Sequence, residues 1–405
     1  MKLLFIVDGR SPIAWNWLCY FINAGHDVHL VSTFPCEPQP GLASFEVIPV
    51  AMSEFGGQGD GASDGKGKYL RQVLPVGLRT LLRQWLGPLT LTPATEQLQG
   101  VIEQIRPDLV HAMRIPYEGM LVALALQRLR NEKKVPLLIS VWGNDFTLHA
   151  RATPLLSHYT RLALQHADAL HTDCQRDLRL AREWGYAAQG PSIVLPGAGG
   201  VQMDIFYPPP FQGQDVRYQQ GAEKESVVII NPRGFRAYVR NDTFFRAIPI
   251  VLKQRPDIRF ICPAMTDEAQ AQKWVTEYRI ASEVDLLPPQ PRQKMADLFR
   301  QAQVTVSITT HDGTPNTLLE AMACGCFPIA GDIESIREWI TPGVNGLLVN
   351  PLDSSALAAA ILTAISQPEL RQQARERNLQ LVRDRAEYQQ VMQAAEEFYT
   401  SVVRQ

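Results

Sequence analysis

Short apolar runs alternate with stretches of helical period along almost all of the 405 residues. In the first half, the runs that predict strands are 3–7, 28–32, 45–50, 109–112, 137–141 and 193–195. Amphipathic helices are predicted at 13–24, 95–105, 120–131, 155–167 and 176–183. Because β–α alternation builds a parallel sheet covered by helices on both faces, the predicted class is α/β and doubly wound.

The same alternation restarts after a proline-rich interruption. Strands are expected at 227–230, 259–262, 284–287, 304–308, 327–330 and 346–349, and three consecutive prolines at 208–210 mark an extended connector before them. The predicted organisation is a first domain at 1–208, a linker at 209–225 and a second domain at 226–384. A helix at about 385–405 either packs back onto the first domain or stays with the second.

Composition excludes some classes of partner. Lysine and arginine number 39 against 41 acidic residues, so the net charge of −2 provides no general field for a nucleic acid. The six cysteines show no paired CxxC spacing, which indicates reduced thiols and a cytoplasmic location. No apolar run reaches the roughly 18 residues of a spanning helix.

The most informative motif follows the expected strand at 304–308. A polar turn containing Asp312 leads into a helix that begins near Asn316 or Thr317, and a free helix N-terminus binds phosphate. Glu320 lies one turn further on, so two carboxylates flank this phosphate site and suit sugar hydroxyls. In the alternative interpretation, Asp312 and Thr317 only cap and turn the chain, and Glu320 is solvated.

Three arginines follow the first strand of the second domain. Arg233, Arg236 and Arg240 lie at the carboxyl end of a strand, where open α/β sheets bind ligands, and guanidinium groups match phosphate oxygens. The alternative is that they are exposed and pair with Asp242. Together with the helix N-terminus, they predict a diphosphate pocket.

These motifs resemble the retaining glycosyltransferases of family 4, over nearly the whole chain. The segment from Asp312 to Glu320, followed by Ala-Met-Ala-Cys-Gly, is similar to the paired-acid motif of that family. Four further segments are similar to family motifs, namely 108–112, 143–145, 195–208 and 343–349. The resemblance implies the GT-B architecture, in which two Rossmann-like domains face each other across a cleft.

The resemblance also implies roles for individual residues. Arg233 and one of Arg236 or Arg240 would clamp the donor diphosphate, and Glu320 would hold the ribose. The transferred sugar would be held by Asp312 and the backbone of the residues after it, which are Gly313, Thr314, Pro315, Asn316 and Thr317. His111 and Asp145 would contact the same sugar from the first domain, although His111 could instead be a packing histidine. Gly9, Arg10 and Ser11 would line the acceptor side, with Gly9 permitting close backbone approach.

The implied reaction is transfer of a hexose from a nucleotide-diphosphate sugar to an acceptor hydroxyl with retention of configuration. A UDP-sugar is the favoured donor, with GDP-mannose second, and the acceptor is a small molecule, a glycan or a lipid-linked molecule. No cofactor or metal is expected, because no Asp-x-Asp pair occurs. Asp312 replaces the usual Glu and Trp142 the usual His. These departures keep two rivals open: an epimerase or phosphorylase of the same architecture, and a catalytically silent nucleotide-sugar binder.

The segment 66–86 combines basic residues with leucines and a tryptophan. Such a composition is typical of interfacial segments, so it predicts peripheral contact with the inner membrane face. Proline and glycine at 75 and 77 break a long helix there, and an internally packed insertion is the alternative.

Overall fold

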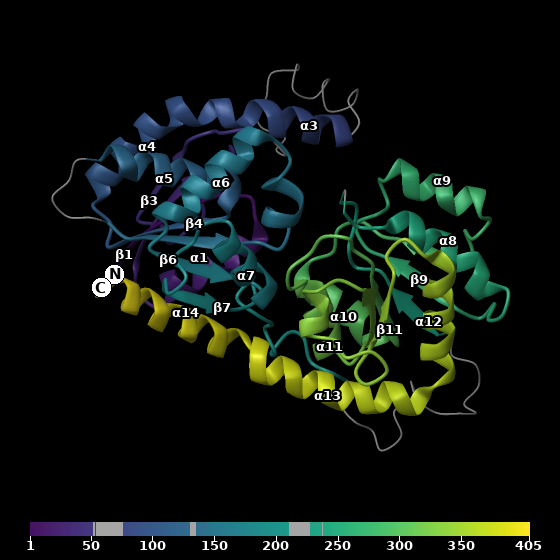
Figure 1. The fold of residues 1–405 in the computed structure, drawn as a ribbon. Helices are drawn as coiled ribbons and strands as arrows, with labels where there is room; N and C mark the ends of the chain where they lie inside the picture. Colours follow the sequence, from purple (N-terminus) through teal and green to yellow (C-terminus); the bar gives the residue numbers. More distant parts are fainter. Residues whose placement is uncertain (52, 54–75, 130–134, 210–226, 237) are drawn as a thin grey trace. The chain divides into compact units, whose positions relative to one another are not determined.

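The computed structural model describes residues 1–51, 53, 76–129, 135–209, 227–236 and 238–405, in two compact units (Figure 1). The first unit comprises Met1–Gly199 and Gln390–Gln405, and the second comprises Gly200–Gln389. All but one residue of the expected linker, 209–225, lies outside the described residues.

The first unit contains a sheet of seven parallel strands in the order β3-β2-β1-β4-β5-β6-β7. Its strands are β1 (Lys2–Val7), β2 (Asp27–Ser32), β3 (Ser44–Val47), β4 (Leu109–Met113), β5 (Leu137–Val141), β6 (Ala169–Thr172) and β7 (Ser192–Val194). Its α-helices are α1 (Pro12–Asn23), α3 (Val76–Leu86), α4 (Leu91–Ile105), α5 (Met120–Arg128), α6 (Pro154–His166), α7 (Gln175–Glu183) and most of α14 (Tyr388–Val403). Short helical turns occupy η2 (Gly87–Thr90), η3 (Ile115–Gly119) and η4 (Asp145–His149).

Alternating side chains of β1 show how this sheet is covered on both faces. Leu4 and Ile6 belong to the core cluster formed with α4, α5 and α6. Phe5 points to the other face, where its ring lies 5.9 Å from that of Phe21 on α1 and 6.5 Å from that of Tyr399 on α14. Residues 390–405 therefore complete the second face of the first sheet.

The second unit contains a sheet of six parallel strands in the order β10-β9-β8-β11-β12-β13. Its strands are β8 (Val228–Ile230), β9 (Arg259–Cys262), β10 (Val284–Leu286), β11 (Val304–Ser307), β12 (Phe327–Gly331) and β13 (Leu347–Val349). Its helices are α8 (Asn241–Leu252), α9 (Ala269–Glu277), α10 (Arg292–Gln301), α11 (Asn316–Ala323), η6 (Ile336–Glu338), α12 (Ser354–Ser366) and α13 (Pro368–Ala386). Ile229 packs in the core with α8 and α12, and its neighbour Ile230 packs with α10 and α11 on the opposite face.

The doubly wound α/β prediction is confirmed, and one strand was missed. All six strands expected in the second half are present, as are the six expected in the first half. The missed strand is β6, whose short Ala-Leu-His-Thr sequence carries a polar residue in its centre.

The strand order of each sheet reverses at one point. In the first unit the reversal lies between β1 and β4, and in the second between β8 and β11. In open α/β sheets, ligands bind at the carboxyl ends of the strands beside such a reversal. The loops after β1, β4, β8 and β11 are therefore the places to look for a site.

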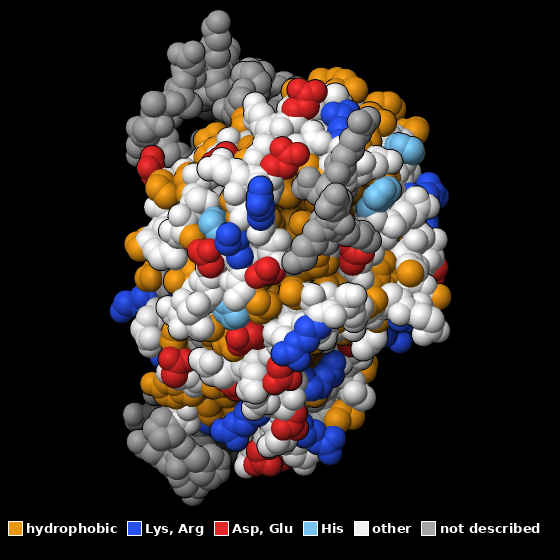
Figure 2. All heavy atoms as spheres, turned by 90° about the vertical axis from the view of Figure 1, so that its left-hand side faces the viewer, with side chains coloured by type: hydrophobic (Ala, Val, Ile, Leu, Met, Phe, Trp, Pro, Cys, Tyr) orange, Lys and Arg blue, Asp and Glu red, His pale blue; other side chains and the backbone are white. Residues whose placement is uncertain are grey.

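Acidic and basic side chains are interspersed on the face of the molecule that Figure 2 shows, in keeping with the small net charge. Among the described residues, none of the helices combines the length and the apolar character that crossing a membrane requires.

Candidate functional site

The loops that follow β8 and β11 are joined by backbone hydrogen bonds. The Arg240 N–H donates to the Ile308 carbonyl at 2.9 Å, and the Thr310 N–H donates to the Tyr238 carbonyl at 3.0 Å. Since β8 and β11 are neighbours in a parallel sheet, both loops leave from the same edge. The arginine segment and the paired-acid segment therefore meet, as the sequence predicts.

Arg233 connects these two loops through its side chain. Its Nη2 donates to Asp312 Oδ2 at 2.5 Å and its Nη1 to Thr317 Oγ1 at 3.2 Å. The side chains of Arg233 and Asp312 are only 11% and 15% exposed. Arg233 Nε and Asn316 Oδ1 are both buried, and no group of the described residues hydrogen-bonds to either. Buried polar atoms without protein partners are rare, so this site has unfilled capacity for a polar ligand.

The N-terminus of α11 contributes backbone donors to the same site. Pro315 precedes the helix, and no side chain caps it, so its first N–H groups keep no intrahelical acceptor. The preceding turn is fixed from outside, because Ser335 Oγ donates to the Asp312 carbonyl at 2.7 Å and Trp339 Nε1 donates to Thr314 Oγ1 at 3.0 Å. A rigid turn that presents free N–H groups suits an anion.

Glu320 lies one turn into α11 and is partly exposed. Burial of the carboxyl raises the pKa of Glu320 to about 7, and the positive charge of Arg292 opposes this shift. Glu320 is therefore poised between its neutral and ionised forms near neutral pH.

The other two arginines of the segment differ from Arg233. Arg240 forms a bidentate pair with Asp242, with Nε and Nη2 at 2.8 and 2.6 Å from the two carboxylate oxygens. Arg236 is exposed and donates to the carbonyl of its neighbour Phe235. Of the three, only Arg233 is hydrogen-bonded to Asp312 and Thr317.

In the first unit, His111 is buried in a chain of hydrogen bonds that crosses the sheet. Tyr399 Oη lies 2.5 Å from His111 Nδ1, His111 Nε2 lies 2.7 Å from Ser140 Oγ, and Ser140 Oγ lies 2.8 Å from His171 Nδ1. The chain ends where His171 Nε2 lies 2.9 Å from the Leu195 carbonyl, which can only accept. Burial lowers the pKa of His111 and brings the pKa of His171 to about 4, so both imidazoles are neutral near pH 7. With neutral rings, each donation runs from Tyr399 towards Leu195.

Asp145 is also fully buried. Its Oδ1 accepts from Arg114, and its Oδ2 accepts from the backbone N–H groups of Ile115 and Trp142, each at 3.1 Å. It thereby joins the loops after β4 and β5, while the Arg114 guanidinium lies 5.2 Å from the centre of the Trp142 ring. Both carboxylate oxygens of Asp145 and both ring nitrogens of His111 are engaged by protein groups. Sugar contacts by either residue remain predictions, and they require these hydrogen bonds to exchange.

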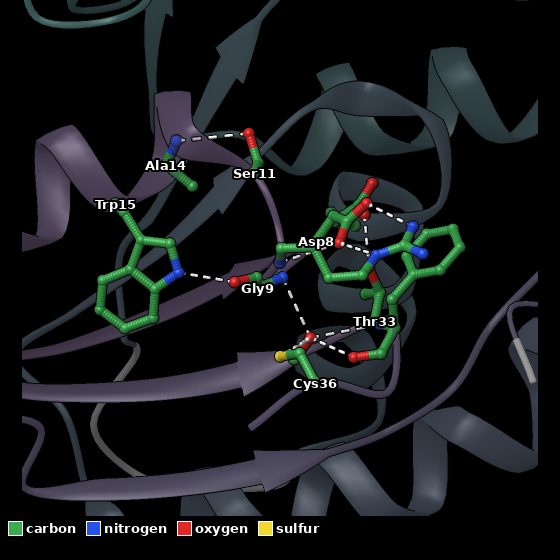
Figure 3. A network of polar contacts seen from close by, with 11 residues as sticks. Asp8, Gly9, Ser11, Ala14, Trp15, Thr33 and Cys36 are labelled. Carbon is green, nitrogen blue, oxygen red and sulfur yellow. Dashed lines mark hydrogen bonds and ion pairs between the residues drawn. The ribbon is translucent and has the colours of Figure 1, made fainter. Parts of the chain in front are cut away.

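Gly9, Arg10 and Ser11 lie at the reversal of the first sheet, and Figure 3 shows the contacts of Gly9 and Ser11. A Cβ on Gly9 would come within 2.8 Å of Ser32 Oγ at the end of β2 and within 2.6 Å of Cys36 Sγ in the loop after it, so this packing requires glycine. Arg10 pairs with Asp8 at 2.9 Å and lies 3.9 Å above the Phe34 ring. Ser11 caps α1 by accepting from the Ala14 N–H. The acceptor role of these three residues stays a prediction.

The sequence pattern missed a cluster beside Phe34. Glu118 is buried and accepts a 2.7 Å hydrogen bond from Thr33, and burial raises the pKa of Glu118 to about 7. Its neighbour Tyr117 has a left-handed φ of 73°, which is strained for a residue with a side chain. The Arg83 guanidinium lies 5.0 Å from the rings of both Phe34 and Tyr117. The hydrophobic periodicity of the sequence does not reveal that Glu118 is buried beside the expected sheet edge.

One group of side chains in the first unit has the composition of a metal site but not the chemistry. Asp173, Cys174 and Asp177 lie close together and buried. The Cys174 thiol donates to Asp177, and Arg176 already pairs with the same carboxylate at 2.7 Å. Burial and the two carboxylates raise the pKa of Cys174, whereas metals bind the thiolate. This group therefore does not fit a metal ion.

Comparison with known proteins agrees with this geometry. Residues 11–197 match the family model described as a glycosyl transferase 4-like domain, and residues 214–380 match that of the glycosyl transferases group 1. Sucrose-phosphate synthase from Thermosynechococcus elongatus is 17% identical, with a TM-score of 0.72 over 99% of both chains. HepE of Anabaena, solved with UDP-glucose, is 16% identical, with a TM-score of 0.69 over 99% of this chain and all of that one.

The fold is thus that of the two-domain GT-B glycosyltransferases. The two family matches together identify the chain as a member of the family 4-like glycosyltransferases. Among curated relatives, the D-inositol 3-phosphate glycosyltransferase of Thermobispora bispora is 27% identical over 188 residues. That match covers 44% of this chain and 43% of the relative, so it spans less than half of either protein.

Proposed function

We propose that the chain is a retaining hexosyltransferase that uses a nucleotide-diphosphate sugar, with a UDP-sugar favoured over GDP-mannose. The observation that carries the proposal is the Arg233 guanidinium, held against Asp312 and Thr317 at the uncapped start of α11. Membership of the family supports it, as does the similar fold of HepE, which was solved in complex with UDP-glucose. Retention rests on the family resemblance.

The main work of this site is electrostatic. When the bond between the sugar and the diphosphate breaks, negative charge grows on the diphosphate. Preorganised donors then stabilise the transition state more than the ground state. Arg233 Nε and the first N–H groups of α11 supply those donors without reorganisation. Asp312 would accept from hydroxyls of the sugar, and Glu320 from those of the ribose.

We assign the second diphosphate contact to Arg236 rather than to Arg240. Arg240 already gives both Nε and Nη2 to Asp242, whereas Arg233 pairs with Asp312 through Nη2 and keeps its Nε without a protein partner among the described residues. Arg236 is exposed, and among the described residues it is hydrogen-bonded only to its neighbour's carbonyl, so its guanidinium can reorient. No metal ion is assigned to the reaction.

The acceptor side is placed on the first unit, at the loop that contains Arg10. No two of the six described cysteines are joined by a disulfide, and we propose a reducing, cytoplasmic setting. An acceptor carried by a lipid would place the enzyme at the inner membrane face.

The test is Arg233→Ala, assayed by transfer from UDP-glucose and other nucleotide sugars to a panel of acceptors. We expect kcat/KM to fall by about a hundredfold or more, as for the loss of one oxyanion donor. Arg255→Ala is the control, because Arg255, like Arg233, is ion-paired to an aspartate, Asp257, but lies outside the candidate site. Equal kcat/KM values for the two variants would refute the assignment. Analysis of products separates transfer from epimerisation and phosphorolysis, and slow donor hydrolysis separates an enzyme from a silent binder.

A further inference from the structure

Glu118 is a buried acid beside the reversal of the first sheet that the proposed donor site does not use. It lies in the loop after β4 and is 3% exposed. Its Oε1 accepts from Thr33 Oγ1 at 2.7 Å, and Thr33 directly follows β2. No described residue forms an ion pair with Glu118, and burial raises its pKa to about 7. A buried carboxyl that a single side chain hydrogen-bonds costs stability, so it is a candidate for ligand binding.

Arg83 brings the opposite charge to the same place from α3. Its guanidinium lies 5.0 Å from the ring centres of Phe34, which follows Thr33, and of Tyr117, which precedes Glu118. Its Nε is buried and has no hydrogen-bond partner in the described part of the chain, and no ion pair joins Arg83 to a described carboxylate. Since Arg83 as a whole is partly exposed, a ligand can reach the pair from its side.

Helix α3 covers residues 76–86 of the segment in which the sequence predicts membrane contact. Residues 66–75 of that segment lie outside the described residues, and the contact stays a prediction. The end of α3 that carries Arg83 is held by Tyr117, whose hydroxyl donates to the Arg83 carbonyl at 2.7 Å. A Cβ on Gly87 would come within 2.8 Å of the same hydroxyl, so this packing is close. The first unit therefore presents Arg83 and Glu118 as a preorganised pair.

The charges around this pair are balanced among the described residues. Each of the two neighbouring arginines is paired with an aspartate, namely Arg10 with Asp8 at 2.9 Å and Arg114 with Asp145 at 3.0 Å. Burial lowers the pKa of Arg83 and raises that of Glu118, and the charge of each residue opposes the shift of the other. With Glu118 ionised, the described groups leave no surplus positive charge for an anion.

We propose that Arg83 and Glu118 form the acceptor subsite of the first unit and bind a neutral part of the acceptor that carries hydroxyl groups. This inference rests on the proposed function and makes the acceptor a polyhydroxylated compound that is uncharged at this position. The place agrees with the predicted acceptor side, because Arg10 lies 3.9 Å from the same Phe34 ring that Arg83 faces.

The hydrogen-bonding capacity of the pair selects hydroxyl groups over anionic groups. A hydroxyl both donates and accepts, so neighbouring hydroxyls can donate to the Glu118 carboxylate and accept from Arg83 Nε. An ionised phosphate or carboxylate can only accept. It would meet Arg83 but would place a like charge beside the buried Glu118. The pair therefore selects against an acceptor that carries its charge at this position.

The test measures transfer by the full chain from UDP-glucose and from GDP-mannose to glucose, mannose and glycerol, each offered free and as its monophosphate. We expect transfer to the free forms. Glu118→Gln should raise the acceptor KM about tenfold or more and leave the donor KM and the rate of donor hydrolysis unchanged, because it removes the charge that accepts from the acceptor. Arg83→Lys should do the same, because lysine has no N–H at the position of Nε. Glu96→Gln is the matched control, since it removes the same charge from the exposed side of α4 in the same unit.

Equal acceptor KM values for Glu118→Gln and Glu96→Gln would overturn the inference and leave the proposed function intact. Preferred transfer to the phosphorylated forms would also overturn it. A loss of donor hydrolysis as large as the loss of transfer would show that Glu118 only supports the fold. A wild type that transfers to no acceptor of the panel would refute the proposed function, and the inference with it. The melting temperature of each variant checks its fold, and Arg83→Lys provides the test if Glu118→Gln does not fold.

Discussion

The chain of hydrogen bonds from Tyr399 to Leu195 makes the stability of the first unit depend on pH. His171 is neutral in the folded state, with its pKa lowered by burial to about 4, whereas an unfolded histidine titrates near 6.5. Above pH 6.5 both states are neutral and the shift has no effect. As the pH falls from 6.5 towards 4, only the unfolded state takes up the proton, so the folded state loses stability.

The magnitude follows from the size of the shift. Each pH unit between the unfolded pKa of 6.5 and the folded pKa of about 4 lowers the unfolding free energy by about 1.36 kcal/mol. Acidification below pH 4 therefore costs about 3 kcal/mol of unfolding free energy, and acidification from pH 8 to pH 5 costs about 2 kcal/mol. The variant His171→Gln removes the titrating group but keeps an N–H that can donate to the Leu195 carbonyl. It leaves the Ser140 hydroxyl without its acceptor, so we expect it to be about 1–3 kcal/mol less stable at pH 8.

The assay is urea denaturation at pH 8, 7, 6 and 5, with hydrogen exchange of the peptide covering β4 used to assign the transition of the first unit. Between pH 8 and pH 5 the wild-type protein should lose about 2 kcal/mol more unfolding free energy than His171→Gln. Tyr399→Phe is the control, because it deletes a hydrogen bond of the same chain but keeps both imidazoles. Parallel pH profiles for wild type and His171→Gln would show that His171 is not held neutral.

Three further results are expected. If the carboxylate of Glu320 holds the ribose, its pKa of about 7 predicts that the Kd for UDP-glucose rises about tenfold from pH 8 to pH 6. Glu320→Gln should make the Kd nearly independent of pH, and identical pH profiles of Kd for the two proteins would exclude this role. Gly9→Ala should lower the unfolding free energy by about 1–3 kcal/mol, because the added methyl overpacks against Cys36, and its melting temperature should fall. Gly100→Ala, whose methyl meets open space on a helix, should not lower the melting temperature, and an unchanged melting temperature for Gly9→Ala would contradict the packing argument. Transfer activity should survive EDTA, and loss that added Mg²⁺ or Mn²⁺ restores would reverse the assignment of a metal-free site.

The pattern of apolar residues predicted the fold because most strands lie inside parallel sheets and therefore carry continuous apolar runs. The exception, β6, was missed because it is only four residues long and half of it is polar, His171 and Thr172. The longer run of β4 was recognised despite its central His111. In both strands the partners that permit a buried histidine are distant in sequence, namely Ser140 and Leu195 for His171 and Tyr399 for His111.

The sequence predicted the location of the candidate site better than the contacts between its residues. Arg233 follows β8 and Asp312 follows β11. Because these two parallel strands are neighbours, both residues lie at the same edge of the sheet. The sequence could not show which of the three arginines would meet Asp312, because Asp242 competes for Arg240 from only two residues away. The sequence likewise could not show the contacts of Asp145 with Arg114 and Ile115, because these residues come from another loop, and its sugar contact stays a prediction.

The division of the first unit into two stretches of sequence affects its synthesis. Residues 1–199 leave the ribosome long before 390–405, whereas the second unit is continuous from 200 to 389. Until Tyr399 emerges, the nascent sheet presents the rings of Phe5, Phe21 and His111 without the ring that covers them. The part of the protein made first is therefore the last to be completed, and a chain that stops at 389 would leave an apolar surface open to chaperones and proteases.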